Sequence, residues 1–196
     1  MINEKTIFRQ IGADEFKVNE YELSARIGLC SSCMEERLME NIPDLMARVS
    51  PKYCAVKCDV EYISEGVLKI GGIEIKSRDI IKNLGGAKEA YLFAATLGAE
   101  VDRFLLRLGM ISGADRFVVD GYASALVEAL CDFAEAEIFG DKPRCKRFSP
   151  GYGDLSLDIQ GELLTLVSAE NLLGITLTDK KMMIPAKSVT AIIGCK

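Results

Sequence analysis

Histidine is absent from the 196-residue sequence, and this absence excludes more chemistry than any motif in the chain. Without histidine, neither a Ser-His-Asp triad nor a Cys-His pair can form, no imidazole can bind a metal ion, and no histidine can shuttle a proton. Any catalysis must therefore use carboxylates, Arg, Lys, Tyr, Cys or a bound cofactor.

Long apolar runs and an excess of positive charge are also lacking. No run approaches the roughly 18 to 20 apolar residues that a membrane helix needs, and the first residues carry charges where a signal peptide is apolar. We therefore expect no membrane association and a cytoplasmic location. Lys and Arg number 24 against 29 Asp and Glu, so the formal net charge of -5 offers no broad basic surface. A nucleic-acid partner is not expected.

Two nucleotide-binding motifs are missing as well. The sequence has no G-x-G-x-x-G that opens a first strand-to-helix turn and no G-x-x-x-x-G-K-[ST]. A Rossmann-type methyltransferase or dehydrogenase and a P-loop enzyme are therefore not favoured.

Seven cysteines are present, an odd number that indicates reduced thiols in a cytoplasmic protein. Cys30, Cys33, Cys54 and Cys58 could together form a four-sulfur zinc site. The second spacing is loose, and neither pair lies in the Gly-rich turn that is typical of such sites. We favour buried or incidental thiols over a metal site or a redox role.

The first part of the chain predicts helices and then strands. Residues 19–49 carry apolar positions at helical spacing, and Pro43 is expected to begin a second short helix at its first turn. Alternating apolar residues typical of strands follow, and Gly71-Gly72 between two such runs predicts a hairpin. Ser77 is expected to cap a short helix that runs to about Asn83 and is ended by Gly85-Gly86.

The second part alternates between long helices and apolar strands. The continuous apolar run at 89–98 predicts a strand buried on both faces, followed by a helix over 99–109. Residues 114–139 form the strongest predicted helix, and a further helix is expected over 157–173. The chain closes with two predicted strands that are separated at Pro185.

Together these elements predict an α+β fold: a single mixed domain with a mostly antiparallel sheet flanked by helices, since regular crossover helices do not separate the strands. We expect residues 1–50 to form a helical N-terminal layer packed on residues 51–196, as one structural unit.

The strongest predicted helix has distinct apolar and acidic positions. Its expected core face consists of Phe117, Val118, Ala125, Leu126, Ala129, Leu130 and Phe133. Its acids, Asp115, Glu128, Asp132 and Glu135, are interpreted individually as a solvated face.

Three blocks of sequence, taken in order, resemble a known family. Residues 121–137 make the long helix, Arg147-x-x-Pro150-Gly151-Tyr152 makes a turn, and residues 172–189 read LLGITLTDKKMMIPAKSV. This arrangement resembles the AdoMet-binding reactivation (activation) domain of cobalamin-dependent methionine synthase, in which an R-x-x-P-G-Y turn precedes a helix, an L-T-[ED]-x-x-x-M-x-P strand and an S-V step. The resemblance covers residues 115–189.

The resemblance implies a site for S-adenosylmethionine (AdoMet), which carries a carboxylate, an ammonium and a sulfonium. Arg147 is expected to bind the carboxylate. Pro150 and Gly151 would hold a turn whose backbone can approach the ligand closely, and Tyr152 would offer its ring to the sulfonium. Ser188, in the matching S-V step, is also expected to contribute.

The acid that binds the ammonium is harder to identify from the resemblance. The family uses a glutamate on the long helix, and ungapped matching places it at Ala136, so Glu135 or Glu137 must substitute unless the helix register differs. Longer members of the family continue the turn as G-Y-P-x-C-P-x-H, whereas residues 151–158 of this chain read GYGDLSLD.

The resemblance also implies partners. The chain has no D-x-H-x-x-G cobalamin motif and no histidine for cobalt. We therefore expect a standalone reactivation subunit that acts on a separate cobalamin-binding methionine synthase chain. In the family chemistry, cob(II)alamin takes one electron from flavodoxin or ferredoxin and a methyl group from AdoMet, which gives methylcobalamin.

The sequence is also compatible with two other functions. The protein could be an AdoMet-responsive accessory protein of another corrinoid methyltransferase. It could instead be a non-catalytic zinc or redox module that uses the N-terminal cysteines.

Overall fold

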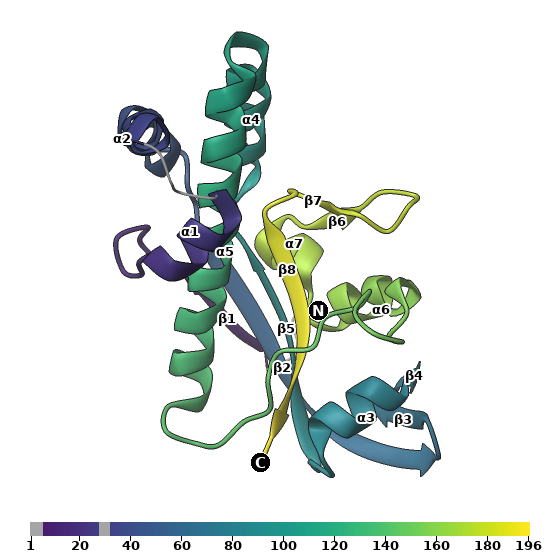
Figure 1. Ribbon diagram of the computed structural model, residues 1–196. Coiled ribbons are helices and arrows are strands. Elements are labelled where there is room, and N and C mark those ends of the chain that lie inside the picture. Colours follow the sequence, from purple (N-terminus) through teal and green to yellow (C-terminus); the bar gives the residue numbers. More distant parts are fainter. Residues whose placement is uncertain (1–5, 28–31) are drawn as a thin grey trace.

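A computed structural model describes residues 6–27 and 32–196, and a curled antiparallel sheet runs through its centre (Figure 1). The strand order is β4-β3-β2-β5-β8, with β1 paired separately to β2. The strands are β1 (Thr6–Gln10), β2 (Lys52–Ser64), β3 (Val67–Ile70), β4 (Ile73–Lys76), β5 (Glu89–Thr96) and β8 (Ser188–Cys195). All the pairings are antiparallel.

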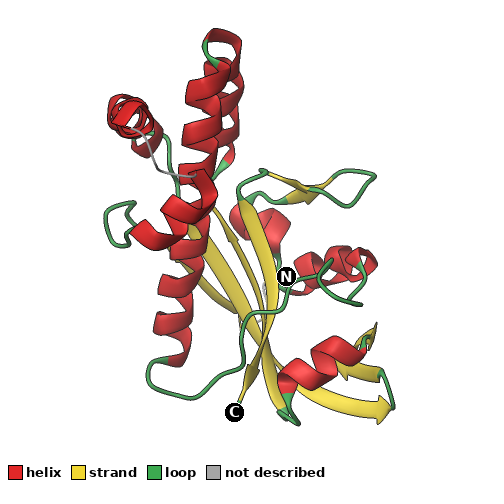
Figure 2. Ribbon diagram, in the orientation of Figure 1, coloured by secondary structure: helices red, strands yellow, loops and turns green. Residues whose placement is uncertain are grey.

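The long strand β2 explains how the sheet curls. Its first part, Lys52–Val56, pairs with β1, and Lys52–Asp59 pairs with β5. Its second part, from Val60 to Ser64, pairs with β3, and the register shifts between Tyr62 and Ser64. The β3-β4 hairpin turns at Gly71-Gly72, as predicted, and extends away from the other strands (Figure 2).

Helices cover both faces of this sheet. One face packs against α4 (Ala99–Ile111) and α5 (Gly113–Phe139), and α1 (Glu20–Ile27) and α2 (Ser32–Met46) contact α5. The other face packs against α3 (Arg78–Leu84), α6 (Gln160–Leu166) and α7 (Ala169–Leu173). The predicted α+β class, a single mixed domain with an antiparallel sheet flanked by helices, is confirmed.

Side-chain alternation along the central strands produces these two cores. Tyr53 and Ala55 of β2 point into the α4-α5 core, whereas Cys54 and Val56 point into the α3-α6-α7 core. Successive residues of a strand face opposite sides of its sheet, so a strand buried on both sides is apolar throughout. The apolar run predicted at 89–98 forms β5 for this reason, and its residues enter both cores.

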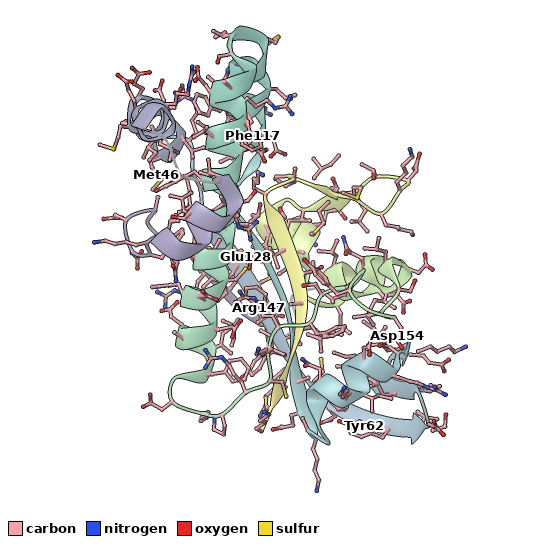
Figure 3. The ribbon with its side chains drawn as sticks, viewed as in Figure 1. Met46, Tyr62, Phe117, Glu128, Arg147 and Asp154 are labelled. Atoms are coloured by element: carbon pink, nitrogen blue, oxygen red, sulfur yellow. The ribbon has the colours of Figure 1, made fainter. Side chains whose placement is uncertain are left out.

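The helix α5 is the long helix that the sequence predicts. The Ser112 side chain accepts a hydrogen bond from the Asp115 N–H at 3.2 Å, and the helix ends at Gly140, which has a φ of 53°. The prediction is wrong for one core residue of this helix, because Phe117 is 56% exposed. Phe117 lies in the part of α5 that extends beyond the sheet beside α4 (Figure 3), where no strand covers it.

The N-terminal part departs from its predicted helical layer in two ways. Residues Thr6–Gln10 form β1, which the sequence analysis did not predict, and this strand joins the central sheet. Pro43 lies inside α2 instead of beginning a helix. The division of the chain at residue 50 stays a prediction.

The helix predicted over 157–173 is also interrupted. A short 3-10 turn, η1 (Leu157–Ile159), precedes α6, and Ser168 separates α6 from α7 with a positive φ of 56°. A left-handed residue cannot continue a right-handed helix, so the chain changes direction there. The final segment forms β6 (Thr176–Leu177) and β7 (Met183–Ile184) as a small hairpin, with Pro185 between β7 and β8 as predicted. Among the described residues, no helix has both the length and the apolar character to cross a membrane.

Candidate functional site

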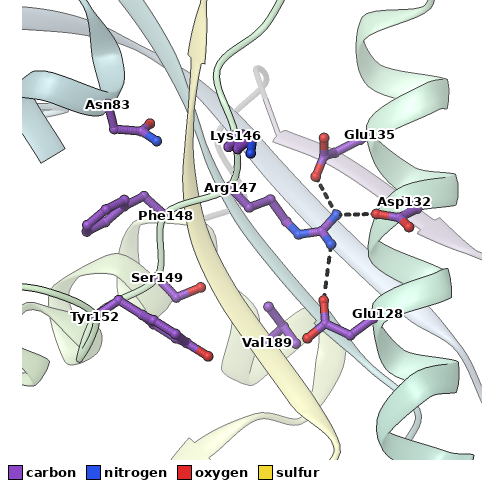
Figure 4. A pocket seen from close by; sticks show the side chains of 10 residues that line it. All are labelled: Asn83, Glu128, Asp132, Glu135, Lys146, Arg147, Phe148, Ser149, Tyr152 and Val189. Carbon is purple, nitrogen blue, oxygen red and sulfur yellow. Dashed lines mark hydrogen bonds and ion pairs between the residues drawn. The ribbon is translucent and has the colours of Figure 1, made fainter. Parts of the chain in front are cut away.

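A loop between α5 and η1 carries the predicted Arg147 and runs beside β8. Phe148 and Ile192 exchange backbone hydrogen bonds of 3.1 and 2.9 Å, and Cys145 N–H donates to the Gly194 carbonyl at 2.9 Å. These bonds fix the backbone on both sides of Arg147. Its side chain then extends across β8 toward α5 (Figure 4).

Three acids of α5 receive the Arg147 guanidinium. Nη2 donates to Glu128 Oε2 at 3.1 Å, and Nη1 donates to Asp132 Oδ1 at 2.8 Å and to Glu135 Oε1. The acids stand at positions i, i+4 and i+7, which lie on one face of a helix. What looked like separate solvated acids therefore forms one charged cluster with Arg147.

The side chains of this cluster differ in how far they are exposed to solvent. The side chain of Glu135 is 9% exposed and also accepts from Arg144 Nε at 2.8 Å, so its carboxylate lies between two guanidinium groups. The Arg147 side chain is 19% exposed, whereas Asp132 is 68% exposed. Ion pairs in water are weak, and desolvated ones are costly to break. The Asp132 contact is therefore the one that is exchanged most easily.

Two adjoining cavities open around this cluster. The first has a volume of about 630 Å³ and is lined by Arg147 and its three acids, with Asn83 of α3 on another wall. The second has a volume of about 370 Å³ and lies between α5 and the segment before β8. Both fall within or near the ~300 to 1,000 Å³ range of small-molecule sites. The residues shared by the two cavities are Glu128, Ser149, Tyr152 and Val189.

The structure brings most of the predicted site residues to these cavities. Arg147 and Glu135 line the first cavity, Pro150 and Ser188 line the second, and Tyr152 lines both. Gly151 has a φ of 91° and donates its N–H to the Leu155 carbonyl at 2.8 Å. An added Cβ would meet Leu157 at 3.1 Å, so glycine suits this turn.

Tyr152 and Ser188 differ in their exposure to solvent. Tyr152 is 69% exposed, so its ring is open to a ligand at the boundary of the two cavities. Ser188 is buried, and its hydroxyl donates to Thr96 Oγ1 at 2.8 Å. The Ser188 side chain therefore helps to hold β8 against β5, and its role toward a ligand stays a prediction.

The two candidate acids differ in where they point. Glu135 faces Arg147, whereas Glu137 accepts from the Tyr53 hydroxyl at 2.6 Å and lies 3.4 Å from Arg9. Of these two, Glu135 is thus the one at the cavity. Both Glu135 oxygens already receive an arginine, however, and the acid that borders both cavities is Glu128. The signal that could have found Glu128 is its i, i+4, i+7 spacing with Asp132 and Glu135.

A second set of polar contacts holds the segment before β8 on the far side of the second cavity. Lys187 Nζ lies 2.7 Å from Ser124 Oγ and 3.0 Å from Asp120 Oδ2, both on α5. The Ala186 N–H donates to Asp102 Oδ2 at 2.7 Å. The spacing of these residues in the sequence gives no sign of the contacts, because the contacts join segments far apart in the chain.

The candidate zinc ligands are only partly described. Cys30 and the side chain of Cys33 lie outside the described residues. Cys54 and Cys58 are both on β2, and residues that are four apart on a strand are separated by about 13 Å. Cys54 is buried in the core, and this burial raises the pKa of its thiol to about 12. Among the described residues, no group of three or more Cys, Asp or Glu side chains is arranged to hold a metal ion.

Comparison with known proteins shows that this α+β fold occurs among solved structures. No protein-family model and no curated protein matches the chain. Among solved structures, the chain is similar to the MetH reactivation domain bound to AdoHcy. The TM-score is 0.74, the sequence identity is 14%, and the match covers 97% of this chain and 78% of that chain. At this identity the similarity shows a shared fold.

Proposed function

We propose that the protein binds AdoMet in the two cavities around Arg147. In this proposal it acts as a reactivation subunit for reductive methylation of cob(II)alamin to methylcobalamin on a separate cobalamin-dependent methionine synthase. The observation that carries the proposal is the meeting of Arg147, an acidic helix face and the Pro150-Gly151-Tyr152 turn at one pair of cavities. The fold shared with the AdoHcy-bound MetH reactivation domain supports it.

The charged groups of the site match the amino-acid end of AdoMet. The carboxylate of AdoMet replaces the exposed Asp132 at the Arg147 guanidinium, because a planar guanidinium binds a carboxylate through two parallel donors. Glu135 remains in place and keeps Arg147 oriented, since Arg144 holds its second oxygen. Glu128, at the boundary of the cavities, accepts the ammonium.

The turn supplies the remaining contacts. Tyr152 presents an exposed ring near Glu128, and an aromatic face attracts a cationic sulfonium. Ser149 and Pro150 line the second cavity, and we expect their backbone groups to contact the nucleoside there. The protein's contribution is thus to bind AdoMet and orient its methyl group toward a partner.

The reaction balances with the partners that the sequence resemblance implies. One electron from flavodoxin or ferredoxin and the methyl group of AdoMet convert cob(II)alamin to methylcobalamin and leave AdoHcy. The cobalamin comes from the partner chain, because this sequence contains no histidine and no D-x-H-x-x-G motif.

A reconstituted reactivation assay tests this function. The protein is mixed with a cobalamin-loaded methionine synthase that lacks its own reactivation domain, together with AdoMet and reduced flavodoxin. We expect the cob(II)alamin absorbance to convert to that of methylcobalamin in this mixture, and to persist when the protein or AdoMet is omitted. The Arg147→Ala variant should slow the conversion. Persistence of cob(II)alamin with every component present would contradict the proposed partner.

A further inference from the structure

The turn that carries Tyr152 is bonded to the first turn of α3, which lies about 75 residues earlier in the chain. The Arg78 N–H donates to Asp154 Oδ2 at 2.8 Å, and the Asp79 N–H donates to Asp154 Oδ1 at 3.2 Å. The Ser77 hydroxyl also donates to Asp154 Oδ1. In return, the Asp154 N–H donates to Asp79 Oδ2 at 3.2 Å. The turn and the helix therefore bond to each other in both directions.

The backbone around Asp154 leaves little freedom to this arrangement. An added Cβ at Gly153, which has a φ of 54°, would lie 2.2 Å from Asp79 Oδ2. The Leu155 N–H donates to the Tyr152 carbonyl at 3.0 Å, and the Leu155 side chain is buried in the core. The short turn is thus fixed at Leu155 by packing and at Asp154 by hydrogen bonds.

This link joins two walls of the first cavity. Tyr152 lies on the turn, two residues before Asp154. Asn83 lies near the C-terminal end of α3, whereas Asp154 bonds to the first turn of the same helix. Because the Tyr152 side chain is largely exposed, its position depends on the backbone of the turn. Release of Asp154 from α3 would let the two walls separate while the sheet stays intact.

We propose that Asp154 is a positioning residue of the AdoMet site, which holds the Pro150-Gly151-Tyr152 turn against α3 so that Tyr152 closes the cavity. This inference rests on the proposed function. Asp154 acts through Tyr152 and the turn, and its carboxylate is directed at the α3 backbone. The hydrogen bonds from Ser77 and from the Arg78 N–H lower the pKa of Asp154, because they stabilise its ionised carboxylate.

The test measures AdoMet affinity by calorimetry for the wild type, Asp154→Ala, Asp154→Asn and a matched control, Asp158→Asn. Asp158 lies four residues further along, in η1, and its carboxylate accepts from the Ser156 hydroxyl. We expect Kd to rise at least about tenfold in Asp154→Ala, less in Asp154→Asn, and less than about twofold in Asp158→Asn. Asn keeps one oxygen for the α3 donors, so it restores part of the link.

Hydrogen exchange separates positioning from a purely structural role. In Asp154→Ala, the amides of Arg78, Asp79 and Leu155 should exchange faster, while those of β5 and β8 keep their protection. If Asp154 only stabilised α3, the folded variant would bind AdoMet with the wild-type Kd, and that result would overturn the inference. An equal loss in Asp158→Asn would also overturn it, because the cause would then be charge.

Two further arms keep the test decisive. If Asp154→Ala does not fold, Asp154→Asn is judged by the same criterion, since it removes the charge and one acceptor of the link while it keeps one oxygen. If the wild type itself does not bind AdoMet, the proposed function fails. If the wild type binds AdoMet and a folded Asp154 variant binds it with the same Kd, this inference is wrong and the proposed function stands.

Discussion

Arg147 Nη2 donates to Glu128 Oε2 across 3.1 Å, and this bond joins the loop after α5 to a carboxylate within that helix. Glu128 also lies 3.8 Å from Arg26 of α1 and borders both cavities. The pair thus joins α5 to the loop after it (Figure 3), and both residues line the first cavity.

Removal of the Glu128 charge should weaken AdoMet binding. A hydrogen bond between two charged groups is stronger than one to a neutral amide, so Glu128→Gln is expected to cost about 1 kcal/mol, or about fivefold in Kd. Calorimetry measures this change. Asp132→Asn is the matched control on the same helix face, and its exposure predicts a change below about twofold. A larger loss of affinity in Asp132→Asn than in Glu128→Gln would contradict the assignment of the ammonium to Glu128.

Tyr53 gives a stability prediction that is independent of the site. Its ring is buried, and its hydroxyl donates to Glu137 at 2.6 Å. Tyr53→Phe removes this bond and should lower the unfolding free energy by about 1 kcal/mol or slightly more, which lowers Tm by about 2 to 4 °C. Thermal unfolding followed by circular dichroism checks it. Tyr62→Phe, where a more exposed hydroxyl bonds the Ala87 carbonyl at 3.0 Å, should change Tm less.

Burial predicts which thiols react. Desolvation raises the pKa of Cys54 to about 12 and also raises that of the buried Cys131, so both thiols stay protonated in the folded protein at pH 8. Among the cysteines whose side chains the structure describes, iodoacetamide should modify the partly exposed Cys58 and Cys195 before Cys54 and Cys131, which should react after unfolding in denaturant. Peptide mass spectrometry identifies the sites. Equal rates for Cys54 and Cys195 in the folded protein would contradict the burial of Cys54.

Local sequence rules predicted the elements that local physics determines. Ser77 caps α3, Gly85 ends it in a left-handed conformation, and the apolar run of β5 is buried on both faces. Each of these features depends on residues close together in the chain. The rules failed where distant segments decide the outcome. The strand β1 exists because β2 offers it an edge, and Phe117 is exposed because α5 extends beyond the sheet.

The same distinction applies to the candidate site: some of its residues could be predicted from local sequence, and others depend on contacts between distant segments. Arg147 and the Pro150-Gly151-Tyr152 turn were found from a contiguous motif. The contacts of Arg147 with Glu128, and of Asp154 with α3, depend on how the chain folds back on itself, so spacing alone could not assign partners to them. Helix periodicity would have placed Glu128 and Glu135 on one face, although it gives no sign that an arginine from the next loop lies between them.

The most direct test of the account is a calorimetric titration of the protein with AdoMet, with Arg147→Ala and Arg147→Lys alongside. We expect saturable binding to the wild type and a loss of about 1.5 to 3 kcal/mol in Arg147→Ala, the range for a hydrogen bond to a charged group. Arg147→Lys should recover little, because an ammonium cannot form the two parallel bonds of a guanidinium. Folded variants that bind AdoMet as tightly as the wild type would contradict the assignment of Arg147. Absence of saturable binding to the wild type would contradict the AdoMet site itself.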